Sequence, residues 1–254
     1  MQLTILGAGS SAGTPVIGCD CATCTSPDKR NQRTRCSSLV ILDSGQHILI
    51  DTGPDLRLQA LREGFTRVDA VLYTHTHADH LHGIDDLRAF CQINRQQIPL
   101  YGSPDAVTHI TNKFGYAIRE PSHFWDLPVL SIQAVEQPFM LLGQQVTPIP
   151  VMHGKIQIYG YRIGNMAYLT DVSEIPEASY ALLQGLEVLL IDCLRHAPHP
   201  THVSVQQSIA IVERIAAQQS IMIHMTHELE YAALTALLPK NSQVGHDGLS
   251  VHFN

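Results

Sequence analysis

The sequence predicts an α/β (α+β) protein that folds as a four-layer αββα sandwich. The 254 residues fall into two similar halves, and each half has a β-rich region followed by helical segments. Two such halves can pack sheet against sheet, with the helices covering the outer faces. No linker or low-complexity tract divides the chain, so we expect one domain that spans residues 1–254.

In the first half, β-branched and aromatic runs between turn-forming residues predict strands. Periodic apolar patterns that follow capping residues predict helices. The expected strands cover residues 3–6, 38–42, 47–50, 68–73 and 99–101. The expected helices end near residue 63 and cover residues 81–94 and 104–113.

The second half repeats this order of strands and helices. The expected strands cover residues 129–135, 145–151, 157–163, 166–169, 188–191 and 220–223, and the expected helices cover residues 175–183 and 203–217. Between the halves, the irregular segment 114–128 contains Phe124 and the only tryptophan, Trp125. This segment is either a packed surface loop or a lid at the rim of a substrate site.

Four potential metal ligands follow the buried strand 68–73 within six positions: His75, His77, Asp79 and His80. Their spacing does not fit one face of a helix, where zinc-binding histidines stand four residues apart. A loop at the carboxyl end of a strand is the natural interpretation, because such loops carry function in layered α/β folds. The alternative is a polar loop that is merely rich in histidine. Imidazoles together with a carboxylate favour a site for zinc, manganese or iron.

Three further candidates also stand where a predicted strand ends, namely His153, Asp171 and His224. A single histidine after a strand is usually structural, but three such positions in a chain with the histidine motif favour a shared site. Asp51 ends another strand. It could cap the following helix, or it could orient a ligand histidine from behind, and the sequence favours neither role.

Half of the six cysteines are crowded into one short stretch, as Cys19, Cys21 and Cys24. The chain shows no signal sequence, so this spacing predicts a metal site in the reducing cytoplasm. Buried free thiols are expected at Cys36, Cys91 and Cys193.

Composition limits the partners that we expect. No apolar run is long enough to span a membrane, and the formal charge of −7 argues against a surface for extended nucleic acid. The 15 histidines nearly equal the 16 lysines and arginines together, which favours metal chemistry.

The glycine-rich residues 7–13 do not open a helix, as a dinucleotide-binding loop must, so an active-site rim is more plausible there.

The His-x-His-x-Asp-His pattern resembles the signature of the metallo-β-lactamase superfamily, and within it the chain is most similar to the PhnP-like cyclic phosphodiesterases. The resemblance implies two divalent metal ions, zinc or manganese. It assigns one ion to His75, His77 and His153, the other to Asp79, His80 and His224, and a bridge to Asp171. It also implies a structural zinc held by Cys19, Cys21, Cys24 and His227.

This resemblance implies hydrolysis of a small or cyclic phosphodiester, such as a phosphoribosyl cyclic phosphate, by an enzyme that can form a homodimer. The cysteine pattern without a signal sequence predicts a cytoplasmic location. Asp79 and His202 are the expected catalytic residues, and His202 could instead be a helix-entry histidine without a catalytic role. Lys155 or Arg88 could offset charge on the phosphate. Residues 85–88 are typical of other superfamily members, which leaves the substrate open.

The alternatives are a tRNase-Z-like nuclease, a thioester or lactone hydrolase, and a zinc-stabilised binding protein with a vestigial site. A tRNA processor should present a basic arm. No cluster of lysine and arginine exceeds the one in residues 29–35, and the complete ligand set argues against a vestigial site.

Overall fold

Two seven-stranded sheets form the centre of the computed structural model, which describes residues 1–118 and 130–254. In spatial order, the first sheet contains β14 (Ser250–His252), β1 (Gln2–Gly7), β2 (Ser37–Ile41), β3 (His47–Ile50), β4 (Ala70–Leu72), β5 (Ile98–Gly102) and β6 (Leu130–Ala134). The second contains β13 (Ser242–Val244), β12 (Gln219–Ile223), β11 (Val188–Asp192), β10 (Met166–Leu169), β9 (Ile156–Ile163), β8 (Gln144–His153) and β7 (Phe139–Leu141).

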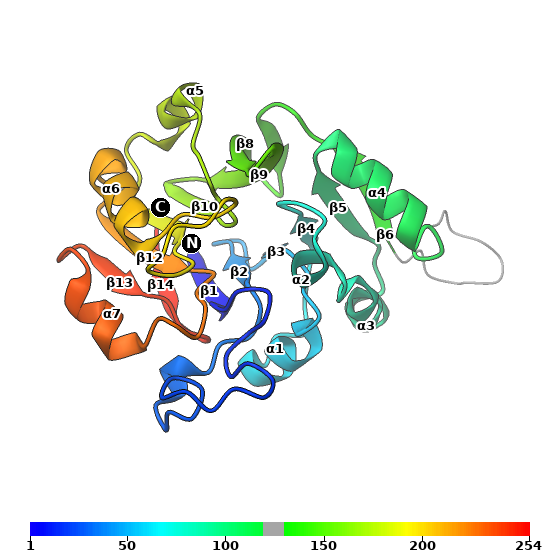
Figure 1. Ribbon diagram of the computed structural model, residues 1–254. Helices are drawn as coiled ribbons and strands as arrows, with labels where there is room; N and C mark the ends of the chain where they lie inside the picture. The colour runs from blue at the N-terminus through cyan, green and yellow to red at the C-terminus, as the bar shows by residue number, and fades with distance from the viewer. Residues whose placement is uncertain (119–129) are drawn as a thin grey trace.

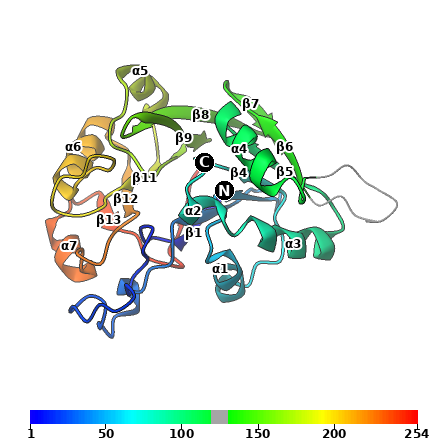
Figure 2. The same ribbon diagram turned by 45° about the vertical axis from the view of Figure 1, so that its right-hand side comes forward.

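Helices cover the outer faces of the two sheets (Figures 1 and 2). Those beside the first sheet are α1 (Leu56–Glu63), α2 (Ala78–Leu81), α3 (Leu87–Asn94) and α4 (Pro104–Phe114), and those beside the second are α5 (Glu177–Tyr180), α6 (Val205–Ile215) and α7 (Tyr231–Leu237). Single 3-10 turns occupy η1 (Lys29–Asn31), η2 (Ile84–Asp86) and η3 (Ala181–Leu183). The predicted αββα sandwich is confirmed.

Strand β3 illustrates why the sheets pack in layers. Ile48 and Ile50 belong to the core between the sheets, whereas Leu49 belongs to the core under the helices of the first sheet. Successive side chains of a strand point to opposite faces, so a strand that is apolar at every position must be covered on both sides. All three residues are fully buried.

The direction of the strands gathers functional side chains at one edge. Strands β3, β4, β5 and β6 are parallel neighbours, and so are β10, β11, β12 and β13. The carboxyl ends of parallel neighbours lie at the same edge of a sheet, which is where open α/β sheets bind ligands. The predicted ligands that follow β4, β10 and β12 therefore come together.

Several predicted elements differ from the structure. The helix expected over 81–94 is divided into α2, η2 and α3 at Gly83, whose N–H donates to the carbonyl of Thr52 at 2.8 Å. A Cβ at Gly83 would lie 2.0 Å from the carbonyl oxygen of Gly53, so the bend requires glycine. The helix expected over 175–183 is one α-helical turn followed by a 3-10 turn.

Three strands and one α-helix were not predicted from the sequence, namely β7, β13, β14 and α7, and neither was the 3-10 turn η1. The three strands have only three residues each, and each is the outermost strand at its edge of a sheet. Such short edge strands carry too few residues for a clear alternation of apolar and polar side chains. Most of segment 114–128, including Phe124 and Trp125, lies outside the described residues, so the lid interpretation stays a prediction.

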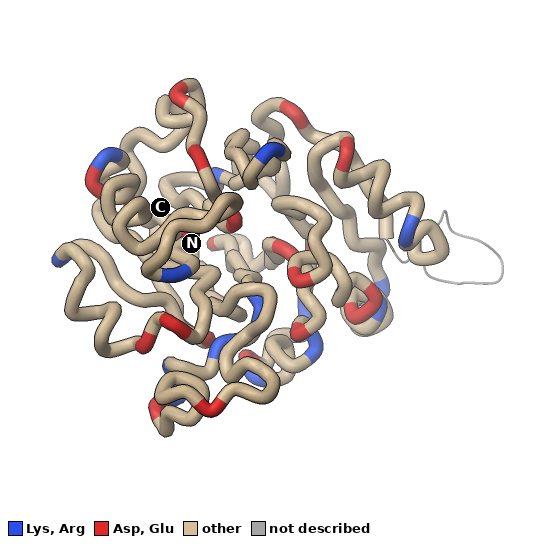
Figure 3. Tube along the Cα trace, in the orientation of Figure 1, with Lys and Arg blue, Asp and Glu red and all other residues tan. Residues whose placement is uncertain are grey.

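Charged residues of both signs are scattered over the molecule (Figure 3). In the 29–35 cluster, Arg30 pairs with Asp28 at 2.7 Å, and Arg35 pairs with Asp55 at 2.9 Å. Arg33 is only 1% exposed. Three of the four cations in the largest basic cluster are therefore already engaged. Within residues 1–118 and 130–254, no helix is long and apolar enough to cross a bilayer.

Candidate metal centre

The ends of four strands bring histidine and aspartate side chains to one point at the common edge of the sheets. The segment after β4 contributes His75 and His77, and helix α2 contributes Asp79 and His80. The second sheet contributes three side chains from the ends of β8, β10 and β12, namely His153, Asp171 and His224. The structure thus brings all seven predicted active-site ligands together.

These seven residues form two groups, and the ligand atoms within each group all lie within 4.8 Å of one another. The first group contains His75, His77, His153 and Asp171, and the second contains Asp79, His80 and His224. One Asp171 oxygen lies 3.8 Å from Nε2 of His75 in the first group. Its other oxygen lies 3.1 Å from Nε2 of His80 and 3.3 Å from Nε2 of His224. The Asp171 carboxylate therefore lies between the two groups.

The Nε2 atoms of this cluster are suited to metal binding. Those of His75, His80 and His224 are buried without a hydrogen-bond partner. A buried polar atom without a partner costs about 1–3 kcal/mol, so native proteins rarely keep several of them together. Inward-facing imidazole nitrogens surrounded by carboxylate oxygens are the donors that zinc and manganese accept. The cluster fits divalent metal ions.

The opposite ring nitrogens of His80 and His153 are anchored. Nδ1 of His80 lies 2.7 Å from Oδ2 of Asp51, and Nδ1 of His153 lies 2.8 Å from the carbonyl oxygen of Thr201. Such bonds fix the ring orientation and leave Nε2 free for a metal. Helix α1 begins after Asp55 rather than Asp51, so the orienting role of Asp51 holds and the capping role does not.

Three residues of this edge have left-handed backbone conformations. Asp51 has φ of 62°, Asp171 has φ of 57° and His224 has φ of 58°. Residues other than glycine adopt this region at a cost of order 1–3 kcal/mol, and they do so mostly at functional sites. Asp51 and His224 directly follow a buried strand, and Asp171 is the second residue after one. The left-handed conformation at these positions directs the side chains toward the shared centre.

Electrostatics keeps part of the cluster neutral. Burial lowers the pKa of His75 well below its ordinary value, and it also lowers the pKa of His153. A neutral imidazole is the form that binds metals. Burial acts on His80 in the same direction, but the carboxylates of Asp171 and Asp51 outweigh it and raise its pKa. This half of the cluster therefore carries the negative charge that a cation would balance.

His202 is buried beside the cluster. Its ring stacks on His224 with centroids 4.9 Å apart, and its Nε2 lies 3.9 Å from Oδ2 of Asp171. Its Nδ1 is 2.8 Å from Oδ2 of Asp192, the last residue of β11. The ligand atoms of His202, Asp171 and His224 also lie within 4.8 Å of one another, so the geometry permits His202 as a ligand as well as an acid.

Asp192 is the residue that the sequence reasoning missed. It is fully buried, it accepts a hydrogen bond from the backbone N–H of Val172 at 2.8 Å, and it fixes the ring of His202. The signal was available, because Asp192 is a carboxylate at the end of a predicted buried strand, as Asp171 is.

The cysteine cluster forms a second site. The sulfur atoms of Cys19, Cys21 and Cys24 lie 3.3, 3.4 and 3.5 Å from Nδ1 of His227. Zinc with ordinary bond lengths at a tetrahedral centre would separate sulfur and nitrogen ligands by about 3.5 Å. A backbone hydrogen bond at Cys24 and the His227 side chain lower the pKa of Cys21 to about 6, which favours the thiolate that binds metal. These four residues fit one zinc ion.

Lys155 and Arg88, which we expect to offset charge on the phosphate, are close in sequence to ligands of the cluster. Lys155 is exposed in the turn after β8, two residues beyond His153, and Arg88 lies in the first turn of α3. Their contact with a substrate stays a prediction.

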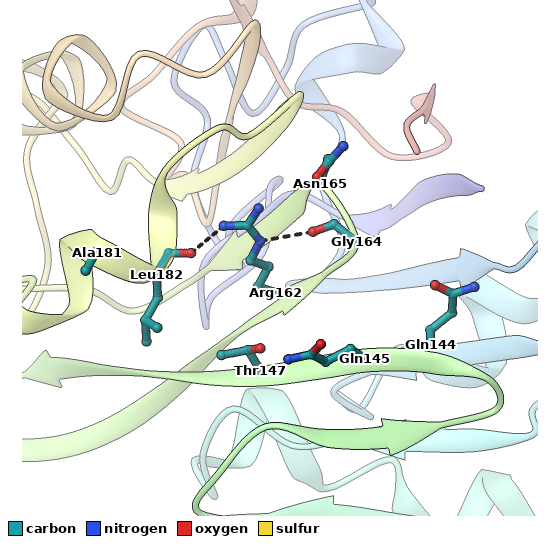
Figure 4. A pocket seen from close by; sticks show the side chains of 8 residues that line it. All are labelled: Gln144, Gln145, Thr147, Arg162, Gly164, Asn165, Ala181 and Leu182. Atoms are coloured by element: carbon teal, nitrogen blue, oxygen red, sulfur yellow. Dashed lines mark hydrogen bonds between the residues drawn. The ribbon is translucent and has the colours of Figure 1, made fainter.

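A cavity of about 430 Å³ lies at the end of the β8–β9 hairpin that is remote from His153 (Figure 4). The Nε atom of Arg162 donates to the carbonyl of Gly164 at 3.0 Å, and Nη1 donates to the carbonyl of Leu182 at 2.8 Å. Arg162 therefore ties β9 to η3. This cavity shares no residue with the metal cluster.

Comparisons with known proteins show which family and fold this chain shares. A family model described as the beta-lactamase superfamily domain matches residues 46–225. The crystal structure of a new diphosphatase from the PhnP family has a TM-score of 0.92 and 42% identity, and the match covers 100% of this chain and 98% of that chain. The crystal structure of zinc-bound PqqB from Methylobacterium extorquens has a TM-score of 0.81 at 21% identity, with full coverage of both chains, which shows a shared fold.

An octanoyltransferase from Porphyromonas gingivalis is 37% identical over 253 residues. The match covers 98% of this chain but 51% of that protein. The chain therefore spans about half the length of this relative, whose name describes the whole protein.

The histidine and aspartate cluster predicts exchangeable metal, and the cysteine cluster predicts one tightly held zinc ion per chain. In Cys21→Ser, tightly held zinc should fall by one ion per chain and the free energy of unfolding should drop, because structural zinc contributes directly to folding. In Asp171→Ala, the exchangeable metal should be lost while the tightly held zinc remains. Elemental analysis before and after mild chelation, with urea denaturation, measures both effects. Equal metal content in Cys21→Ser and the unaltered protein would contradict the zinc assignment.

Proposed function

Because the chain belongs to the metallo-β-lactamase superfamily, we propose that it is a metal-dependent hydrolase of small phosphodiesters, including cyclic ones. One observation carries the proposal: seven donor residues form two groups that share the Asp171 carboxylate, with His202 beside them. Paired cations with a shared carboxylate recur in enzymes that displace an oxygen from phosphorus. The 42% identity to a PhnP-family diphosphatase supports chemistry at phosphorus.

The chain's residues would hold the metals as the two groups suggest. His75, His77 and His153 would hold one ion, and Asp79, His80 and His224 would hold the other, with Asp171 between them. When bound, two divalent ions supply a nucleophile at neutral pH and offset charge on the phosphoryl oxygens.

His202 would protonate the departing oxygen. In this role Nδ1 would donate to the Asp192 carboxylate, 2.8 Å away, and Nε2, which faces the cluster, would carry the proton that is transferred. In the reaction, the P–O bond to the leaving group breaks and the departing oxygen takes the proton from Nε2. Asp192 balances the charge of the imidazolium before transfer.

Asp79 would accept the proton of the attacking water. Burial raises the pKa of its carboxyl, but the facing imidazoles of His224 and His80, whose Nε2 atoms lie 3.6 and 3.3 Å from Oδ2, outweigh that effect and hold the pKa well below its usual range. Asp79 is therefore ionised and acts as a hydrogen-bond acceptor that orients the water. A new bond forms between the water oxygen and phosphorus as the ester bond breaks.

The distribution of cations supports a small substrate. Arg30 and Arg35 are paired with carboxylates, and Arg33 is buried among carbonyl groups. A polyanion such as tRNA is held by several lysines and arginines in a stripe or patch. The largest basic cluster of the sequence offers few cations for that purpose.

A small diphosphate is a second candidate substrate, which the similarity to a diphosphatase favours. Water would attack phosphorus in the same manner, and phosphate would replace the alkoxide as the leaving group. A tRNase-Z-like nuclease, and thioester or lactone hydrolysis, stay as the remaining alternatives within the fold.

A substrate panel tests the proposed class. The metal-replete protein should hydrolyse bis-p-nitrophenyl phosphate, a cyclic nucleotide or a cyclic ribose phosphate faster than a thioester or a lactone. Because few phosphates would be contacted, kcat/KM should change only weakly between 50 and 200 mM salt, whereas six to ten phosphate contacts would lower affinity by about 10³–10⁵. A steep loss with salt would favour the nuclease, and activity confined to the thioester or lactone would overturn the proposal.

Leaving-group dependence tests the role of His202. His202→Ala should leave the metal content unchanged and lower hydrolysis of an alkyl or ribosyl ester by about 10²–10⁴-fold. An activated p-nitrophenyl ester should lose far less, because its leaving group needs no proton. Equal losses on both esters would remove His202 from this role. Loss of metal would indicate that His202 is a metal ligand instead. Asp192→Asn, which keeps the shape of the side chain, should show the same leaving-group pattern with a smaller loss.

A further inference from the structure

A cavity of about 230 Å³ lies directly beside the metal cluster. Its wall on the cluster side consists of Thr74, His75 and Thr76, and its other walls come from the first turns of α4 and the start of β9. The backbone N–H of Tyr159 donates to the carbonyl of Thr74 at 3.1 Å, which holds β9 against the end of β4. A group attached to a phosphate at the cluster could enter this cavity.

The size of the cavity limits what it can hold. Pockets for complete drug-sized ligands have volumes of about 300–1,000 Å³. A smaller cavity next to the reacting centre suits one part of a substrate, about the size of a single sugar, rather than a complete nucleotide.

The lining offers hydrogen bonds from several directions. Asp105 and His109 are one turn apart on the same face of α4, and Gln157 faces them from β9. Ile156 and Ile158 add an aliphatic surface. A carboxylate, an imidazole and an amide around an aliphatic wall match a group that carries hydroxyls on a carbon skeleton.

The charge of the lining argues against a second anion. No lysine or arginine lines the cavity, and among the described residues none lies within ion-pair distance of Asp105. Lys155 is adjacent to Ile156 in sequence but is not among the lining residues. A phosphate in this cavity would face the Asp105 carboxylate with no lysine or arginine among the lining residues to compensate it, and like charges at short range are unfavourable.

We propose that this cavity binds the uncharged, hydroxyl-bearing group of the phosphodiester, a sugar or polyol, and that Asp105 determines this specificity. The inference rests on the proposed function and adds to it the part of the substrate that is selected. Asp105 accepts hydrogen bonds from two neighbouring hydroxyls, and Gln157 and His109 complete the contacts. The same carboxylate excludes substrates with a second phosphate at this position.

Four p-nitrophenyl phosphodiesters test the assignment, because they share a leaving group and differ in the other ester group. These groups are ethyl, a methyl riboside linked through its 5′-oxygen, aminoethyl and 2-phosphoethyl. The unaltered protein should show kcat/KM about ten-fold higher for the ribosyl than for the ethyl ester, as one charged hydrogen bond provides. The 2-phosphoethyl ester should be the poorest substrate.

Two variants separate hydrogen bonding from charge. Asp105→Ala should lower the ribosyl-to-ethyl ratio about ten-fold, mainly through KM. Asp105→Asn keeps a hydrogen-bond acceptor but loses the charge. It should therefore retain part of the ribosyl-to-ethyl ratio and raise kcat/KM for the 2-phosphoethyl ester. Glu213→Gln, on the exposed face of α6, is the matched control and should behave as the unaltered protein. Metal content should be the same in all four proteins.

Ligand-observed NMR with methyl riboside provides a readout that does not need catalysis. Riboside binding that is present in the unaltered protein and lost in Asp105→Ala would support the cavity assignment, even if no diester were hydrolysed and the proposed function failed. If the esters are hydrolysed but the ribosyl-to-ethyl ratio is unchanged in Asp105→Ala, the assignment is wrong and the proposed function stands. Preference for the aminoethyl or 2-phosphoethyl ester in the unaltered protein would also overturn it.

Discussion

Buried imidazole nitrogens that face one another without hydrogen-bond partners are the constraint on which this structure depends. Nε2 of His75, His80 and His224 all point toward the Asp171 carboxylate. Such an arrangement is unfavourable by itself, because each unpaired buried group costs about 1–3 kcal/mol. The rest of the fold must therefore hold these rings in place, and bound cations would convert the cost into a gain by binding only the folded state.

The holding elements come from both sheets. Asp51 after β3 anchors His80 after β4, and Asp192 at the end of β11 anchors His202 before α6. Left-handed backbone at Asp51 places its carboxylate under the motif, and Gly83 lets the chain pack closely against Gly53 at that point. Asp192 ends a buried strand and Asp51 directly follows one, and both carboxylates are fully buried, so the rings have little freedom to turn.

The amino-terminal segment extends this arrangement to the cysteine cluster. Cys19, Cys21 and Cys24 meet His227, three residues beyond His224. The guanidinium of Arg33 donates to the carbonyls of Thr226 and Leu229, on either side of His227. Metal at the cysteine cluster would thus fix the chain that follows β12 and, through it, the position of His224.

Much of this could be predicted from the sequence because the informative residues stand at strand ends. Strand ends are visible as apolar runs that stop, and the two-sheet architecture follows from the order of those runs. Asp192 was missed although it follows a predicted buried strand, because the fold and not the sequence spacing brings its partners, the His202 ring and the Val172 N–H, to its carboxylate. Asp105 and Gln157 line one cavity because β9 packs against the end of β4, a long-range contact that no local pattern encodes. The short edge strands β7, β13 and β14 are likewise fixed by their neighbours.

Anomalous X-ray diffraction from crystals of the protein grown with zinc tests the central claim most directly. The account predicts three metal positions per chain. Two should lie in the histidine and aspartate cluster with Asp171 between them, and one should lie among Cys19, Cys21, Cys24 and His227. A single metal in the histidine and aspartate cluster, or Asp171 in contact with only one metal, would contradict it.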